Sequence, residues 1–429
     1  MAPIAAPAPA LPPTIRISFS SDRFFFGLAA GAAGRRSTIL GCDSTNCCLD
    51  TLGFDSSMGV FVIPSRIGPI ATHSGQRNHE QGGSRTPFSA ALSQGSSPHK
   101  RCGSAYNDRM LAVHLESRRV EVRKVARPQR KESFALIRLL AGGICNTDLE
   151  LQRGYYGFIG TPGHEFVGEV VNADNPNLLA RRVVGEINLA CRKCDWCRRG
   201  LGRHCPKRSV LGIQGHPGAF REFLTLPEAN LHVIPDSISN EAAVFVEPLA
   251  AVCEILDQAS IPDGAEIAVL GDGKLGLLIA QVLNACRKNV HLYGRHKNKM
   301  RIAERAGVQV IVSKPASKPK PGAYDWVIEA TGSSDGLQQA IRMTRPRGTI
   351  FLKSTVHGSV HLDTAPVIVN EITLIGSRCG RFEPALALLQ SHRINVVDMI
   401  SDTMPLAQAK RAFARAAERG VLKVLVKPD

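Results

Sequence analysis

The chain has 429 residues, 44% of them hydrophobic, and a net charge of +16. This length suits two domains plus an extension, and the absence of any apolar run of about 18 residues argues against a membrane-spanning helix. The positive charge is scattered and lacks interleaved aromatic residues, so we expect phosphate-bearing ligands and no specific nucleic acid.

Residues 1–109 open with an Ala/Pro run, are poor in acidic residues and show no sustained helical or strand period. We predict a disordered extension. This composition also resembles an organelle transit peptide, which would place the protein in a plastid or mitochondrion instead of the cytoplasm. Two other interpretations stay open, namely a segment without function and a true start at Met110.

Residues 110–246 contain short strands separated by glycines, which predicts a compact antiparallel barrel. Strands are expected at Met110–Leu115, Val120–Val125 and Phe134–Leu140. The segment also carries two groups of possible metal ligands, described next.

The first group is the closely spaced series Cys191, Cys194, Cys197 and Cys205. Four thiolates can surround one tetrahedral ion and leave no open position, which is typical of structural zinc. An iron–sulfur cluster is less consistent, since seven residues precede the final Cys-Pro where the ferredoxin pattern has three. A nucleic-acid-binding zinc finger lacks its usual histidine pair here. We predict structural zinc and a reducing compartment.

The second group combines Cys145 with His164 and Glu165, with Glu247 as a further candidate carboxylate. A catalytic zinc needs about three protein ligands and one exchangeable position. An alcohol bound at such a position loses its proton readily. A His-Glu pair alone is most often an ordinary surface or core pair, but the cysteine and the downstream elements favour the metal.

From about Glu247 the pattern changes to alternating strands and helices, which predicts a doubly wound parallel sheet. The loop that follows the strand Glu266–Leu270 and opens a helix consists of Gly271, Asp272, Gly273, Lys274, Leu275 and Gly276. Its glycines permit a tight turn, close approach of a pyrophosphate and helix packing. We therefore predict a dinucleotide site.

The turn after the second strand bears on the choice between NAD and NADP. NAD sites place a carboxylate there, whereas here Gly294 is followed by Arg295, His296 and Lys297. Cations suit a 2′-phosphate, so we predict that NADP is preferred. A solvated basic turn that accepts both cofactors is the alternative.

At this point residues 110–429 resemble the zinc-dependent medium-chain alcohol dehydrogenase family. The resemblance rests on the order of Gly143–Asp148, Gly163–Gly168, the Cys191–Cys205 lobe, Glu247-Pro248-Leu249 and Gly271–Gly276. Glu247-Pro-Leu is similar to the polyol, glucose and threonine dehydrogenase branch. The resemblance implies an α/β protein with a GroES-like barrel (110–246), a Rossmann domain (247–376) and a tail (377–429) that returns to the barrel.

The resemblance also implies roles. Cys145, His164 and Glu165 would hold the catalytic zinc, with Glu247 as exchangeable ligand or substrate contact. Thr147 would pass the alcohol proton outward, Asp148 would orient ligands, and hydride would pass from the substrate to the nicotinamide. Several members carry a histidine where Glu150 stands, so Glu150 is a candidate for the proton path.

We therefore expect a zinc-dependent oxidoreductase that interconverts a small hydroxylated alcohol (a polyol, sugar, amino alcohol or secondary alcohol) and a carbonyl, as a dimer or tetramer. Three rival interpretations are a zinc-free quinone or enone reductase of the same superfamily, a catalytically silent zinc- and nucleotide-binding protein, and a nucleic-acid-binding zinc protein. Both metal groups argue against the first, and Thr147 beside an intact Cys145 group argues against the second.

Overall fold

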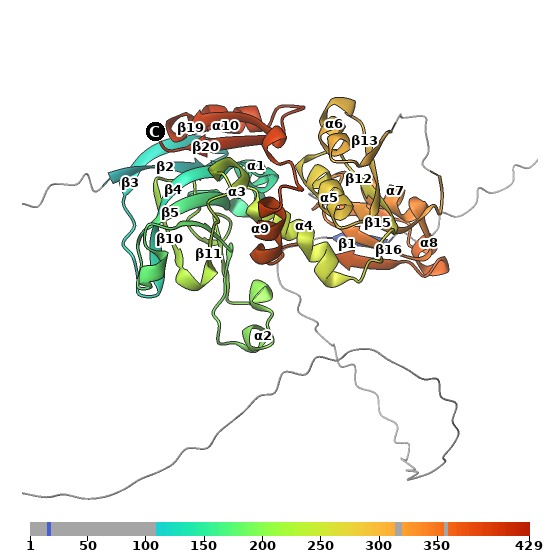
Figure 1. Ribbon diagram of the computed structural model, residues 1–429, viewed down its shortest axis with the longest axis horizontal. Helices are drawn as coiled ribbons and strands as arrows, with labels where there is room; N and C mark the ends of the chain where they lie inside the picture. Colours follow the sequence, from blue (N-terminus) through green and yellow to red (C-terminus); the bar gives the residue numbers. More distant parts are fainter. Residues whose placement is uncertain (1–14, 19–108, 314–319, 356–358) are drawn as a thin grey trace, which may run out of the picture. The chain divides into compact units, whose positions relative to one another are not determined.

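The computed structural model describes residues 15–18, 109–313, 320–355 and 359–429 (Figure 1). Of the first 108 residues only Ile15–Ser18 is therefore described; it forms strand β1, which the sequence did not suggest, and pairs antiparallel with β17 (Ser359–Leu362). The expected disorder and targeting role of residues 1–14 and 19–108 lie outside the described residues, and Arg109 already belongs to a strand.

The segment that follows forms short strands, as its glycine turns predict. Its elements are β2 (Arg109–Glu116), β3 (Arg119–Ala126), β4 (Phe134–Gly143), α1 (Asn146–Gln152), β5 (Glu165–Asn172), β6 (Arg182–Gly185), β7 (Asn188–Leu189), α2 (Asp195–Arg198), β8 (Ser209–Leu211), β9 (Gly215–His216), β10 (Phe223–Pro227), β11 (Leu231–Val233) and α3 (Asn240–Ala243). A seven-stranded sheet has the order β11-β6-β5-β4-β20-β19, with β10 also on β4. Its pairings are antiparallel except β19–β20. The residues of the second metal group lie where β4 ends and β5 begins.

The second part alternates helices and strands. Its elements are α4 (Val246–Gln258), β12 (Glu266–Leu270), α5 (Lys274–Ala285), β13 (Asn289–Gly294), α6 (Lys297–Arg305), β14 (Gln309–Val312), β15 (Tyr324–Glu329), α7 (Gly336–Met343), β16 (Thr344–Leu352), α8 (Ala365–Val369) and β18 (Thr373–Gly376). The strand order β14-β13-β12-β15-β16-β18 is all parallel, and β12 starts the series at its centre. This is the doubly wound order of dinucleotide-binding sheets.

The side chains of β12 point alternately to the two faces of the sheet, and both faces are buried. Ile267 and Val269 pack into the core beneath α4 and α5, whereas Ala268 and Leu270 pack into a second core under α7. Neighbouring side chains of a strand point to opposite faces, so a run of apolar residues without alternation suits a sheet covered by helices on both sides.

The last segment leaves the parallel sheet and joins the first one. It contains α9 (Phe382–Gln390), β19 (Ile400–Pro405), α10 (Ala409–Ala416) and β20 (Lys423–Lys427). Strand β20 pairs with the end of β4, and Figure 1 shows this red segment beside cyan β2 and β4. A 3₁₀ turn (Leu406–Gln408) leads into α10, which ends at Ala416, and Gly420, at φ +90°, lies in the turn that leads to β20.

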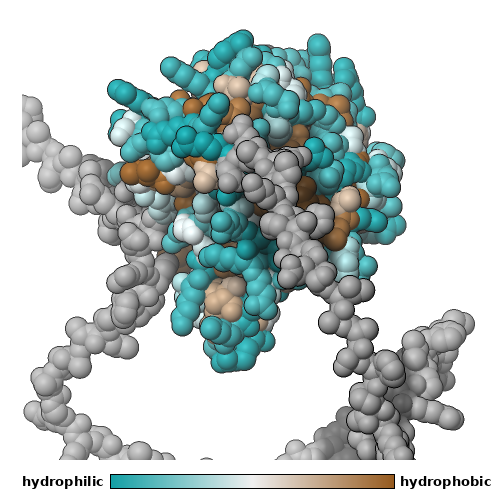
Figure 2. Space-filling view, turned by 90° about the vertical axis from the view of Figure 1, so that its left-hand side faces the viewer, coloured by the Kyte–Doolittle hydropathy of each residue, from teal (hydrophilic) through white to brown (hydrophobic). Residues whose placement is uncertain are grey.

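The visible face in Figure 2 is mostly hydrophilic, with hydrophobic residues in separate patches. Within the described ranges, every helix is too short or too polar to cross a bilayer.

Candidate metal and nucleotide sites

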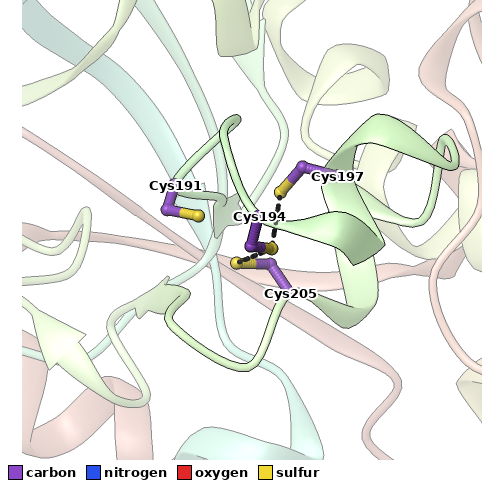
Figure 3. Close-up of side chains that lie close together, drawn as sticks. All are labelled: Cys191, Cys194, Cys197 and Cys205. Atoms are coloured by element: carbon purple, nitrogen blue, oxygen red, sulfur yellow. Dashed lines mark hydrogen bonds between the residues drawn. The ribbon is translucent and has the colours of Figure 1, made fainter.

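The structure brings the four cysteines of the first metal group together in a lobe around α2 and β8 (Figure 3). The Cys194 sulfur lies 3.5 Å from that of Cys197 and 3.7 Å from that of Cys205. Zn–S bonds of about 2.3 Å in a tetrahedron imply sulfur–sulfur edges of about 3.8 Å. The spacing therefore fits a tetrahedral ion.

The electrostatics of the lobe also suit a cation. The backbone amide of Lys193 is the largest influence that lowers the pKa of Cys191, to about 6. Burial and the neighbouring thiols instead raise the pKa of Cys197 to about 12. Four thiolates this close repel one another, so all four can be deprotonated together only around a positive ion.

The second metal group lies where β4 ends and β5 begins. Cys145 precedes the first turn of α1, His164 directly precedes β5, and Glu165 is the first residue of β5. One ligand atom from each lies within 4.8 Å of the others. His164 and Glu165 are buried, and Cys145 is partly exposed. Three ligands with one accessible side are the arrangement of a metal site that keeps an open position.

Asp148 contacts two members of this group, Cys145 and His164. Its side chain is fully buried and accepts hydrogen bonds from the backbone amides of Cys145, at 2.8 Å, and Gly163, at 3.2 Å. Its Oδ1 lies 3.4 Å from Nδ1 of His164, a nitrogen that makes no hydrogen bond with good geometry among the described residues. Burial lowers the pKa of His164, but Asp148 and Cys145 outweigh it and hold that pKa well above its usual value. The pocket therefore favours positive charge.

A buried lysine completes the surroundings of the second group. Lys423 of β20 is 2% exposed and donates to Oε2 of Glu165, which is 1% exposed. Burial lowers the pKa of Lys423, but Glu165 and Cys145 raise it above its usual value. Lys423 was not predicted from the sequence, where the only signal was a cation directly before the apolar run Val424–Val426 of β20.

The remaining predicted residues of this region lie in different surroundings. The Cys145 thiol lies 3.9 Å from the Thr147 hydroxyl. Glu150 pairs with Arg153 at 2.5 Å, on the same helix. Glu247 is not among the three converging ligands, although it lies near enough to sense His164 and Glu165; burial is the largest influence and raises its pKa.

The glycine-rich loop has the predicted strand–turn–helix geometry between β12 and α5. Gly271 adopts φ +114°, and a Cβ on Gly276 would stand 1.9 Å from the Gly271 carbonyl oxygen, so both positions require glycine. Leu275 packs against the core. Lys274 instead reaches the metal region, where its Nζ lies 3.4 Å from the carbonyl oxygen of Ile144.

A cavity of about 470 Å³ lies beside this loop. It is bounded by α1, the turn after β13, the start of α6 and residues 416–421. Its cationic and imidazole side chains are Arg153, Lys274, Arg295, His296, Lys299 and Arg419, and its one acidic lining residue is Glu418. Such a cavity suits a ligand with several phosphates.

The turn after β13 differs from expectation in one respect. The sequence shows no carboxylate there, but Asp272 of the glycine-rich loop reaches it in space. Its Oδ2 accepts from the backbone amides of Arg295, at 2.7 Å, and His296, at 2.5 Å, and lies 3.0 Å from Nδ1 of His296. The only sequence signal was an acidic residue between two loop glycines.

Comparison with known proteins matches two family descriptions to these regions. The alcohol dehydrogenase GroES-like domain matches residues 131–236, which hold both metal groups. The zinc-binding dehydrogenase domain matches residues 274–391, which begin at the helix of the glycine-rich loop.

Named relatives cover the same part of the chain. D-arabitol-phosphate dehydrogenase from Enterococcus avium is 29% identical, over 70% of this chain and 92% of that protein. D-altritol 5-dehydrogenase from Agrobacterium fabrum is 28% identical, over 66% and 88%. The crystal structure of a zinc-binding dehydrogenase from Sinorhizobium meliloti 1021 bound to NADP is 29% identical with a TM-score of 0.69, and covers 75% of this chain and 99% of that one.

Proposed function

The chain belongs to the zinc-dependent medium-chain alcohol dehydrogenase family, and we propose that it oxidises a small polyhydroxylated alcohol to a carbonyl, reversibly, with NADP preferred. Family membership makes it a zinc-dependent alcohol or polyol oxidoreductase that uses a nicotinamide nucleotide. The observation that carries the proposal is the proximity of the two sites: Lys274 of the nucleotide loop contacts Ile144, the neighbour of Cys145. Polyol substrates of the two named relatives support the substrate class.

We assign two zinc ions. Cys145, His164 and Glu165 would hold the catalytic ion, with Glu247 as the exchangeable ligand or substrate contact, and the four cysteines of the lobe would hold the structural one. Zinc in the catalytic group supplies positive charge that favours the deprotonated form of an alcohol.

The chain's own residues orient the group and carry the proton. Asp148 would orient the group, since it accepts a hydrogen bond from the Cys145 backbone and lies 3.4 Å from Nδ1 of His164. Thr147, whose hydroxyl lies 3.9 Å from the Cys145 thiol, would pass the hydroxyl proton of the substrate outward through its own hydroxyl. Glu150, paired with Arg153 on the same helix, would receive this proton and pass it to water.

The NADP preference rests on the cationic cavity. Arg295 and Lys299 line it beside the turn that follows β13, where a 2′-phosphate would lie. Arginine can grip such a phosphate with two parallel N–H bonds. The NADP bound to the S. meliloti relative supports the same choice.

We also propose a homo-oligomer that uses the free edge of the parallel sheet. Strand β18 ends the sheet order, and Ile368, Val369 and Leu374 at this edge are 72%, 79% and 38% exposed. Unpaired edges with exposed apolar residues favour pairing with another copy. Light scattering of wild type and Val369→Asp would test it, since the variant should have the lower mass.

Residues 1–109 remain our candidate for a transit peptide to a plastid or mitochondrion, on composition alone. Fusing them to a fluorescent protein tests this; a diffuse cytoplasmic signal would instead indicate a cytoplasmic enzyme.

The activity test compares full-length wild type with Cys145→Ala and with the control Cys286→Ala, whose cysteine belongs to neither metal group. Reduced-nicotinamide absorbance is followed with polyols, sugars and polyol phosphates, using NADP and NAD. We expect turnover in wild type and the control, and its loss in Cys145→Ala. Absence of turnover in a wild type that binds zinc and NADP would favour the catalytically silent alternative.

A further inference from the structure

The side chain of Asp272, the second residue of the glycine-rich loop, contacts the turn after β13. We propose that Asp272 is a positioning residue that fixes this turn, so that Arg295, His296 and Lys299 can select the 2′-phosphate of NADP. The inference rests on the proposed preference for NADP. It concerns a residue that neither a metal group nor the proton path uses.

The geometry ties the carboxylate to the turn at three points. Oδ2 accepts from two consecutive backbone amides, those of Arg295 and His296, and contacts the His296 ring. The approach is close because residue 294 is glycine: a Cβ there would stand 2.5 Å from Cβ of Asp272 and 2.8 Å from its Oδ2. The close contact between Asp272 and the turn therefore requires glycine at position 294.

Electrostatics explain why an acidic residue is needed. Helix α6 starts directly after His296, and its first turn contains Lys297 and Lys299 but no acidic residue. The positive end of this helix dipole stabilises negative charge, and Asp272 lies at that end, since its Oδ2 accepts from the amide of His296. Burial raises the pKa of Asp272, but the His296 and Arg295 amides outweigh burial and leave that pKa below its usual value.

Asp272 acts through the turn and makes no contact of its own with the cofactor. Its side chain is 12% exposed, and it is absent from the described residues that line the cavity, whereas Arg295, His296 and Lys299 line it. Because its Oδ2 occupies the two amides, phosphate selection falls to these side chains. Losing the carboxylate should release the turn and disperse them.

The test measures nucleotide binding without substrate, by calorimetry on the full chain. The probes are adenosine 2′,5′-bisphosphate and adenosine 5′-monophosphate, which differ by the 2′-phosphate alone. For Asp272→Asn, of nearly equal size, we expect about a tenfold weaker affinity for the bisphosphate and less than twofold change for the monophosphate.

Two further variants make the result specific. Glu304→Gln makes the same charge change on α6, where the Glu304 side chain is exposed and contacts no cation among the described residues, so it should bind both probes as wild type does. Gly294→Ala should reproduce the selective loss, because its Cβ would stand 2.5 Å from Cβ of Asp272. The same Cβ would stand 2.6 Å from Sδ of Met300, so the melting temperature of this variant is measured as well.

Equal weakening for both probes would overturn the inference, since a merely structural role predicts it. Tighter binding of the bisphosphate by Asp272→Asn would also overturn it, since the carboxylate would then act by repelling phosphate. A wild type that does not distinguish the probes would refute the NADP preference itself. A wild type that distinguishes them and an Asp272→Asn variant that does so equally would refute only the role of Asp272.

Discussion

Replacing Lys423 by methionine tests the buried ion pair beneath the catalytic metal group. The substitution removes the ammonium and keeps most of the side-chain volume, so Glu165, 1% exposed, loses its cation. Two charges about 3 Å apart at an effective dielectric constant near 20 attract by about 5 kcal/mol. Relief from burying the ammonium offsets part of this, so we expect a loss of about 3–5 kcal/mol in unfolding free energy.

Urea unfolding at pH 7, with zinc and after chelation, measures the effect. The loss should be larger in the chelated protein, because a metal ion beside Glu165 replaces part of the missing positive charge. Lys427→Met is the matched control: this lysine is on the same strand, and its ion pair with Glu241 is about one-third exposed, so we expect less than about 1 kcal/mol. Equal losses for Lys423→Met and Lys427→Met would refute the reasoning.

Three further predictions concern other parts of the chain. Cys205→Ser should lower bound zinc, measured by atomic emission, by one ion per chain; unchanged zinc would contradict the lobe assignment. Burial lowers the pKa of Lys353 to about 8, whereas the lysine of the unfolded chain keeps its proton up to about pH 10.5. The free energy of unfolding should therefore rise by about 3 kcal/mol between these two pH values. Urea titrations should show this rise for wild type and not for Lys353→Met. Gly276→Ala should lose both stability and nucleotide affinity, whereas Gly273→Ala, whose Cβ would meet open space, should melt like wild type and lose affinity alone.

The sequence predicts well where its signal is local. The strand Glu266–Leu270 has the expected bounds, and the glycine-rich loop follows it directly into α5. The four lobe cysteines span 15 residues, so short loops suffice to bring their sulfurs together. In each case the interacting residues are close in the chain, so their spacing in the sequence is enough to predict the local structure.

Contacts between distant segments were not predictable in the same way. Lys423 and Glu165 are 258 residues apart, and a lysine at a strand end ordinarily indicates exposure. Asp272 reaches the turn after β13 only because parallel strands place their carboxyl ends at one edge of the sheet. Because Asp272 brings a carboxylate to the turn, the lack of one within the turn sequence says little about the choice between NAD and NADP. The cationic side chains of the cavity favour NADP more directly.

The charge arrangement around Cys145 links the C-terminal segment to the chemistry. Two lysines lie near this group, Lys423 of β20 and Lys274 of the glycine-rich loop. The charges of Cys145, Glu165 and Asp148 act to raise the pKa of both. When Cys145 is a thiolate and both His164 and Glu247 are neutral, the three anions outnumber the two lysines, so the site attracts a divalent cation. Once such a cation is bound, the balance becomes positive, and a buried site with net positive charge favours the negatively charged form of a hydroxyl held there. The lysines therefore weaken metal binding somewhat while strengthening the effect of the metal on its substrate.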